Sequence, residues 1–147
     1  MKALIQRVTS ASVGIDSKVV GQIGRGMVVF IGVGRDDSEA DVRYLADKII
    51  GLRIFPHGNS EFDISVSDIN GDILIISQFT LMANLRKGRR PSFAEAAQPE
   101  KAQLLYDSFV DQIRSTGLKT ETGVFQEHML VKINNDGPFT LWVDSKK

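Results

Sequence analysis

The chain of 147 residues contains no cysteine. This absence excludes a disulfide framework, a thiolate nucleophile and a zinc-thiolate site, and it suits a reducing compartment. The chain also has no excess of charge, because 18 Lys and Arg residues face 18 Asp and Glu residues. A generally basic nucleic-acid coat is therefore excluded, and any contact with nucleic acid must be local.

Long apolar runs are missing as well. No run approaches the length that spans a membrane, and Gln6 and Arg7 stand where a signal peptide would continue its apolar core. We therefore expect a cytoplasmic protein.

What the chain does have is the composition of a globular protein, with 42% hydrophobic and 24% charged residues. A chain of this length folds as one ordinary domain that buries about two-thirds of the surface of its unfolded state. No repeat, low-complexity segment or linker divides it, so residues 1–147 are expected to form a single domain.

Two helices are predicted from their start signals and their periodicity. Ser38 is a good N-cap for a helix with apolar residues at helical spacing over 42–50, and Pro99 fits the first position of a second amphipathic helix. Gly117 is a plausible C-cap for that second helix.

About eight strands are expected from period-2 and continuous apolar patterns. A hairpin is predicted around residues 16–18, and a second one at Asn70-Gly71, the strongest short hairpin signal in the chain. The expected strands cover residues 3–8, 13–15, 19–23, 27–31, 64–69, 72–77, 129–133 and 139–143, and residues 53–55 are a candidate for a further short strand. The fold class that follows is α/β or α+β, with a mixed, mostly antiparallel sheet or barrel-like sheets and two long helices.

Most chemical templates fail on this sequence. Gly32 and Gly34 imitate a dinucleotide fingerprint, but the third glycine position holds Asp37, whose charge opposes a pyrophosphate. Residues 68–72 resemble the start of a calcium loop without its required glycine and closing glutamate. His57 and His128 have no metal-binding spacing, and nothing ties either to a serine. We predict no metal site and no cofactor.

Two local features survive these tests. Residues 86–90 read RKGRR, four cations on a glycine-containing loop, which suits phosphate binding but is equally compatible with a solvated loop. Residues 77–81 read SQFTL, where hydroxyl residues follow an apolar strand directly. Free backbone N–H groups at such a strand end can stabilise an oxyanion, although the position is usually just a strand terminus.

A third feature is the step Gly137-Pro138, set between two strand-like runs. Proline fixes φ and glycine allows close approach, so this backbone could present a rigid row of carbonyl acceptors. For an isolated Gly-Pro, however, a hairpin turn is the more common structure.

Together these stretches resemble the D-aminoacyl-tRNA deacylases, also called D-tyrosyl-tRNA(Tyr) deacylases. The resemblance rests on SQFTL at 77–81, NLRKGRRPSF at 84–93 and NDGPFT at 135–140, three motifs in the order and spacing of that family. The opening residues and the closing strands fit too, so the match covers essentially the whole chain. One difference is Gln126-Glu127, where the family usually has Gly-Ala.

The resemblance implies the fold of that family and a homodimeric hydrolase that releases D-amino acids, and mischarged glycine, from tRNA. Gly137-Pro138 would be cis and would enter the partner's active site, where its carbonyls leave no room for an L side chain. The implied catalytic residues are Ser77, Gln78, Phe79 and Thr80. Substrate contacts fall on Phe125, Met129 and Asn135, and tRNA phosphates on Arg86, Lys87, Arg89 and Arg90.

Two questions stay open. Thr80 could be the nucleophile or could position the substrate; we favour positioning, because no adjacent base is visible to activate its hydroxyl. A non-catalytic tRNA- or RNA-binding module and a hydrolase of small esters are the alternative functions.

Overall fold

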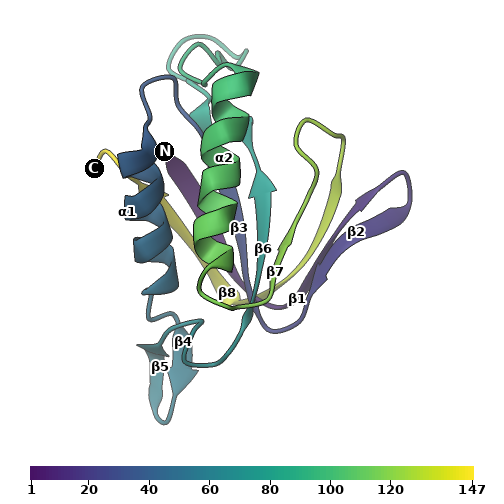
Figure 1. The fold of residues 1–147 in the computed structure, drawn as a ribbon, viewed down its shortest axis with the longest axis vertical. Coiled ribbons are helices and arrows are strands. Elements are labelled where there is room, and N and C mark those ends of the chain that lie inside the picture. The colour runs from purple at the N-terminus through teal and green to yellow at the C-terminus, as the bar shows by residue number, and fades with distance from the viewer.

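The computed structural model describes residues 1–147, and two helices cover one face of its main sheet (Figure 1). They are α1 (Glu39–Ile50) and α2 (Pro99–Arg114). The predicted start of α1 is confirmed: Ser38 is the N-cap, and the Asp41 carboxylate accepts the Ser38 N–H at 2.8 Å. Pro99 is the first residue of α2, also as predicted.

Six strands form the main sheet in the order β2-β1-β3-β6-β7, and β8 pairs with the other edge of β1 along its length. The pairs β3–β6 and β6–β7 are parallel, and the others are antiparallel. A separate two-stranded sheet holds β4 and β5. The strands are β1 (Lys2–Ile15), β2 (Lys18–Ile23), β3 (Gly26–Gly32), β4 (Phe55–His57), β5 (Ser60–Ile64), β6 (Asp72–Ser77), β7 (Thr120–Thr122) and β8 (Leu130–Asp144).

The sheet curls toward the side away from the helices, so that the arms β1–β2 and β7–β8 give it a barrel-like form (Figure 1). This confirms the predicted mixed fold with two long helices. The central strands are buried on both faces, which explains their continuous apolar sequence. In β6, Ile73 and Ile75 belong to the core under the helices, whereas Leu74 and Ile76 belong to a smaller core inside the curled part.

The predicted hairpin at Asn70-Gly71 is wrong. Residues 65–71 form turns closed by the Asp68 carboxylate, which accepts the Ser65 N–H at 2.7 Å, and by a Gly71 N–H bond to the Val66 carbonyl. Asn70 does adopt a positive φ of 48°, but the chain then enters β6, which pairs in parallel with β3 rather than with the preceding segment. Burial of Val66 in the main core holds the segment in this turn.

Smaller corrections concern boundaries. The expected strands 3–8 and 13–15 are parts of one strand, β1, and the expected strand 53–55 begins only at Phe55. Helix α2 ends at Arg114 with Ser115 as its C-cap, and Gly117 lies in the following turn with φ 83°. No helix of the structure combines the length and the apolar character needed to cross a membrane.

Candidate active site

The SQFTL segment lies where β6 leaves the sheet. β6 ends at Ser77, the Gln78 N–H donates to the Ile31 carbonyl at 2.8 Å, and a short 3-10 helix, η1 (Phe79–Met82), follows. The first N–H groups of a helix have no partner within it, so those of Phe79 and Thr80 are available to an acceptor. The Gln78 side-chain amide donates to the Thr80 hydroxyl, which fixes that hydroxyl on an exposed surface.

Beside this segment is a cavity of about 560 Å³. Its walls come from the ends of β3 and β6, the start of α2 and the segment 125–129, which follows β7. Five residues implied by the resemblance line it: Ser77, Gln78, Phe79, Phe125 and Met129. Thr80 directly follows Phe79 in the chain but is not itself a lining residue. The volume lies in the range of small-molecule sites, and most of the lining side chains are apolar.

Local bonds hold the wall 125–129 in place. The Val124 N–H donates to the Met129 sulfur at 3.4 Å, and the Phe125 ring lies 6.1 Å from the ring of Tyr106. The Tyr106 hydroxyl donates to the Ile75 carbonyl at 2.9 Å, and burial raises the pKa of Tyr106 above its usual value, so this phenol stays neutral and structural. Gln126, at the position where the resemblance expects glycine, has a positive φ of 65°.

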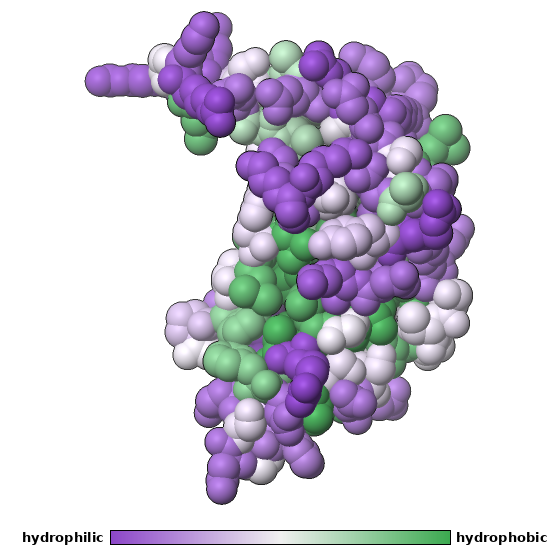
Figure 2. All heavy atoms as spheres, turned by 90° about the vertical axis from the view of Figure 1, so that its left-hand side faces the viewer, coloured by the Kyte–Doolittle hydropathy of each residue, from purple (hydrophilic) through white to green (hydrophobic).

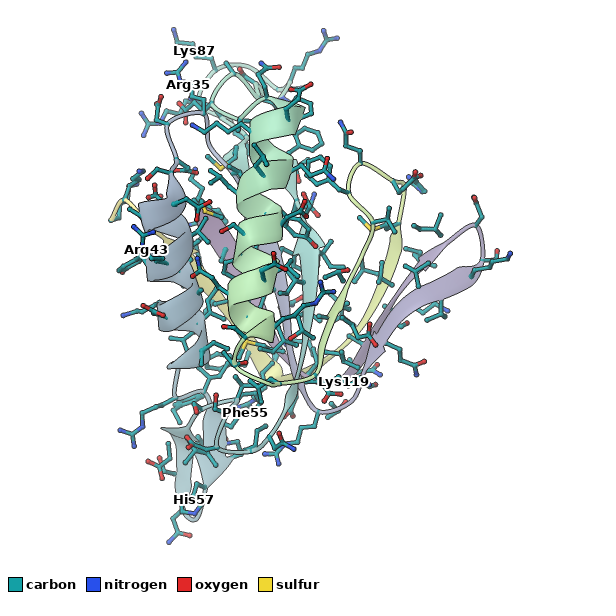
Figure 3. All side chains as sticks on the ribbon, in the orientation of Figure 1. Arg35, Arg43, Phe55, His57, Lys87 and Lys119 are labelled. Atoms are coloured by element: carbon teal, nitrogen blue, oxygen red, sulfur yellow. The ribbon has the colours of Figure 1, made fainter.

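The loop with the four cations stands next to η1. The Asn84 and Ser92 backbones bond to each other in both directions, at 2.8 and 3.1 Å, and the Phe93 ring packs edge-on against Phe79 at 4.9 Å. In the loop closed by these bonds, the four cationic side chains are exposed, and none of them forms an ion pair. They belong to Arg86, Lys87, Arg89 and Arg90. Figure 3 shows Lys87 and His57 at opposite ends of the molecule. The His57 ring lies 3.2 Å from the Asp63 carboxylate in the β4–β5 hairpin.

The Gly137-Pro138 step is not the hairpin turn that its residue types favour. The two runs flanking it belong to one strand, β8, which pairs with β1 from Leu130 to Asp144. Between the pairs Val8–Asn135 and Gln6–Thr140, residues 136–139 leave the ladder as a bulge. Gly137 and Pro138 are exposed there, and their peptide bond is cis, as the resemblance implies.

The bulge and the cavity are separate within the chain, because neither Gly137 nor Pro138 lines the cavity. Seen from the side of α1, the molecule is hollowed, and apolar atoms gather in and around the hollow (Figure 2). Phe62, Phe79 and Trp142 are among the large apolar side chains left exposed.

Arg7 is a residue that the sequence reasoning missed. It is only 5% exposed and lies under the bulge, where its guanidinium donates to the Ile54 carbonyl at 2.7 Å and to the Asp136 carbonyl at 3.3 Å. Its guanidinium also lies 5.2 Å from the centre of the Phe139 ring. An arginine between the inward-facing Ile5 and Val8 was the one available signal, because a charge in a buried strand needs partners.

Asn135 acts on the same bulge. Its side-chain amide donates to the carbonyls of Arg7 and Phe139, both at 2.9 Å. The resemblance implies a substrate contact for Asn135; within the chain its side-chain N–H groups tie the two ends of the bulge together.

No group of three or more His, Asp or Glu side chains gathers closely enough to hold a metal ion. Asp37, which breaks the dinucleotide pattern, is buried; its carboxylate accepts the Gly34 N–H at 2.6 Å and pairs with the Met1 amine at 2.7 Å. It is a structural residue.

Known proteins resemble the whole chain. A family model described as D-Tyr-tRNA(Tyr) deacylase matches residues 4–144. A D-aminoacyl-tRNA deacylase of Desulforamulus reducens is 54% identical over 147 residues, which is all of this chain and 99% of the relative.

Solved structures share the fold. One of a c-Myc DNA unwinding element binding protein is 38% identical, with a TM-score of 0.93 over 98% of both chains. One described as a probable eukaryotic D-amino acid tRNA deacylase has a TM-score of 0.84 over 97% of both chains; at 20% identity it supports the fold alone.

Proposed function

The chain belongs to the D-Tyr-tRNA(Tyr) deacylase family, an enzyme family, and we propose that its single domain hydrolyses the ester between a D-amino acid and the terminal ribose of tRNA. The observation that carries this proposal is the cavity of about 560 Å³ between η1 and the segment 125–129. Its apolar walls fit a nucleoside, and free N–H groups stand beside it at the start of η1.

The chemistry needs an attacking water and a site for the oxyanion. Water adds to the ester carbonyl carbon, and the N–H groups of Phe79 and Thr80 stabilise the negative charge on the carbonyl oxygen. The bond to the ribose oxygen then breaks, that oxygen takes a proton, and the free amino acid and tRNA leave. Ser77 and Gln78 shape the pocket of the terminal adenosine, with Phe125 and Met129 against the base.

Thr80 positions the substrate in this scheme. Its hydroxyl is bonded to the Gln78 amide, a donor that cannot remove its proton, and no histidine or carboxylate is bonded to it. Deacylation by Thr80→Ala and Thr80→Ser tests this role. We expect Thr80→Ala to keep substantial turnover; loss of turnover in Thr80→Ala with rescue by Thr80→Ser would identify Thr80 as the nucleophile.

Chirality is proposed to come from Gly137 and Pro138 of the partner in a homodimer. Their carbonyls accept hydrogen bonds from the substrate ammonium and fill the space of an L side chain, while a D side chain points away. Glycine has no side chain to exclude and is therefore also a substrate. The proposal is supported by the exposure of both residues and by their absence from the cavity of their own protomer.

Contact with tRNA is assigned to residues 86–90, which we call the basic loop. Its four exposed cations have no carboxylate partner, so they are free to neutralise acceptor-stem phosphates. The proposed role is proofreading of mischarged tRNA, which places the protein in the cytoplasm, where aminoacyl-tRNA is used.

One assay separates this function from its alternatives. The protein is incubated with D- and L-aminoacyl-tRNA carrying the same amino acid, and with a free ester of the D-amino acid. We expect release from D-aminoacyl-tRNA only. Binding of tRNA without release would favour the RNA-binding module, and hydrolysis of the free ester alone would favour a small-molecule hydrolase.

A further inference from the structure

A second cavity, of about 300 Å³, borders the first, because His128 lines both. It is formed by the β1–β2 hairpin and the first residues of β8. In Figure 1 this hairpin and the β7–β8 connection extend together to the side away from α1. Nothing in the proposed hydrolysis uses this cavity.

The floor of the second cavity is a glycine between two apolar side chains. Gly14 on β1 is opposite Leu130 on β8 and opposite Val19 on β2, and Leu130 and Val19 are 64% and 63% exposed. A Cβ atom at Gly14 would lie only 3.2 Å from the Lys18 carbonyl oxygen. This close approach of the backbone favours glycine at position 14, and the absence of a side chain there leaves a trough between the exposed apolar side chains of Val19 and Leu130.

The rim of the trough carries more positive than negative charge. Lys18 and Lys132 line it together with His128, and Asp16 supplies the one carboxylate. Neither lysine forms an ion pair. Hydroxyl groups come from Ser17 and from Ser12, which is paired in register with Lys132. Apolar walls beneath free ammonium groups suit a base attached to a phosphate.

The orientation of the proposed substrate points to the same ligand. In a terminal nucleoside the 3′ and 5′ oxygens lie on opposite sides of the ribose. If the ester on the ribose faces η1, the 5′ oxygen faces away from η1, and the second cavity meets the first at His128 rather than at η1.

We propose that the second cavity binds the nucleotide that precedes the terminal adenosine of the RNA. Its base lies on Val19 and Leu130 above Gly14, and the phosphate joining the two nucleotides lies near Lys18 and Lys132. This inference rests on the proposed function for the identity of the terminal nucleoside. It gives the single-stranded RNA end its own site, distinct from the basic loop.

Binding of adenosine is compared with binding of cytidylyl-(3′→5′)-adenosine by calorimetry. We expect the wild-type protein to prefer the dinucleotide by about tenfold. The double variant Lys18→Gln/Lys132→Gln should lose this preference and bind adenosine unchanged. A matched control, Arg43→Gln/Lys48→Gln, removes two exposed cations from α1 and should keep the preference. With D-aminoacyl-tRNA, the first double variant should raise KM by about tenfold at constant kcat.

Equal binding of the two ligands by the wild-type protein, or a preference that survives in Lys18→Gln/Lys132→Gln, would overturn the inference. So would a change in oligomeric state without a change in preference, which would make the trough a contact between two copies. A lysine-dependent preference in a protein that releases no D-amino acid would instead refute the proposed function and keep the nucleotide site.

Discussion

Two charged regions of the molecule differ in what their charges contact. One region, which we call the closing cluster, consists of Met1, Asp37, Asp41 and Lys146. These four residues form ion pairs with one another, and both carboxylates are buried. In the basic loop, residues 86–90, the four cations are exposed and have no ionic partner. The first arrangement binds chain segments to each other, whereas the second leaves its charge available for a ligand.

The closing cluster joins three distant segments. The Lys146 ammonium lies 2.8 Å from the Asp41 carboxylate at the start of α1, and the Ser145 hydroxyl donates to the same carboxylate at 2.7 Å. The Met1 amine donates to the Ser145 hydroxyl at 2.6 Å. Changes on this helix-covered side should therefore alter stability, and changes on the cavity side should alter binding and selection.

The largest expected loss of stability is in the core under the helices. Phe109 is fully buried, and Phe109→Ala should lower the free energy of unfolding by about 3–5 kcal/mol because it leaves a cavity. Urea denaturation measures the change. The control on the same helix is Leu104→Ala, at a position 71% exposed, which should stay within about 0.5 kcal/mol. Equal effects of the two variants would contradict the packing described for α2.

Arg7 combines features of both regions, because its side chain is buried but supports the exposed bulge at residues 136–139. Arg7→Met leaves the carbonyls of Ile54 and Asp136 without their donor, and it should cost about 2–3 kcal/mol of stability.

The same variant should also narrow the ratio of D to L release, because the bulge loses its support. Arg7→Lys keeps the charge and should recover part of both losses. A folded Arg7→Met protein with unchanged selectivity would show that Arg7 only stabilises the fold.

Asp41 gives the closing cluster a pH dependence. Burial alone would raise the pKa of Asp41, but hydrogen bonds from Lys146, Ser145 and the Ser38 N–H hold it well below its ordinary value of 3.8. A lowered pKa in the folded state adds stability above pH 3.8, and this stability is lost as the pH falls below that value.

Asp41→Asn should therefore lower stability at pH 7 by about 1–2 kcal/mol. It should also flatten the decline of stability below pH 4, as measured by thermal unfolding over a pH series. Parallel pH profiles for the variant and the wild-type protein would exclude Asp41 as the source of the dependence.

The smallest effect on stability is expected in the basic loop. Arg89→Gln/Arg90→Gln should change the free energy of unfolding by less than about 0.5 kcal/mol. The same variant should reduce the slope of log affinity for tRNA against log salt, by about 0.9 for each lost phosphate contact. An unchanged slope would show that the loop does not contact tRNA phosphates. The contrast between the basic loop and the closing cluster would then be wrong.

Features that depend on neighbours in sequence were predictable. The N-cap Ser38, Pro99 at the start of α2 and the doubly buried strand β3 all follow from local patterns, and each is confirmed. The hairpin prediction at Asn70-Gly71 failed because the strand after these residues pairs with β3, over forty residues earlier. The turn residues carry no information about that partner strand.

The candidate site divides in the same way. Ser77, Phe79 and Phe125, which the resemblance assigns to one site, line the same cavity. The residue types around Gly137 alone favoured a hairpin turn, and only the continuous register with β1 shows that the chain does not reverse there. Arg7 escaped notice because its bond to the Asp136 carbonyl joins residues 129 positions apart.

The central claim is that Gly137-Pro138 of one protomer acts at the cavity of the other, and mixed dimers test it most directly. One parent carries Gly137→Val, which should lose selectivity because a side chain at Gly137 would meet the Phe139 nitrogen at 2.9 Å. The other parent carries Phe79→Pro, which removes one proposed oxyanion donor and should be inactive.

After the two parents are unfolded and refolded together, the account predicts that D-selective release reappears. Each mixed dimer then holds one cavity and one bulge that are both intact and lie on different chains. Mixed dimers that form without any D-selective release would contradict the claim. They would show that the bulge does not act at the cavity of the other protomer.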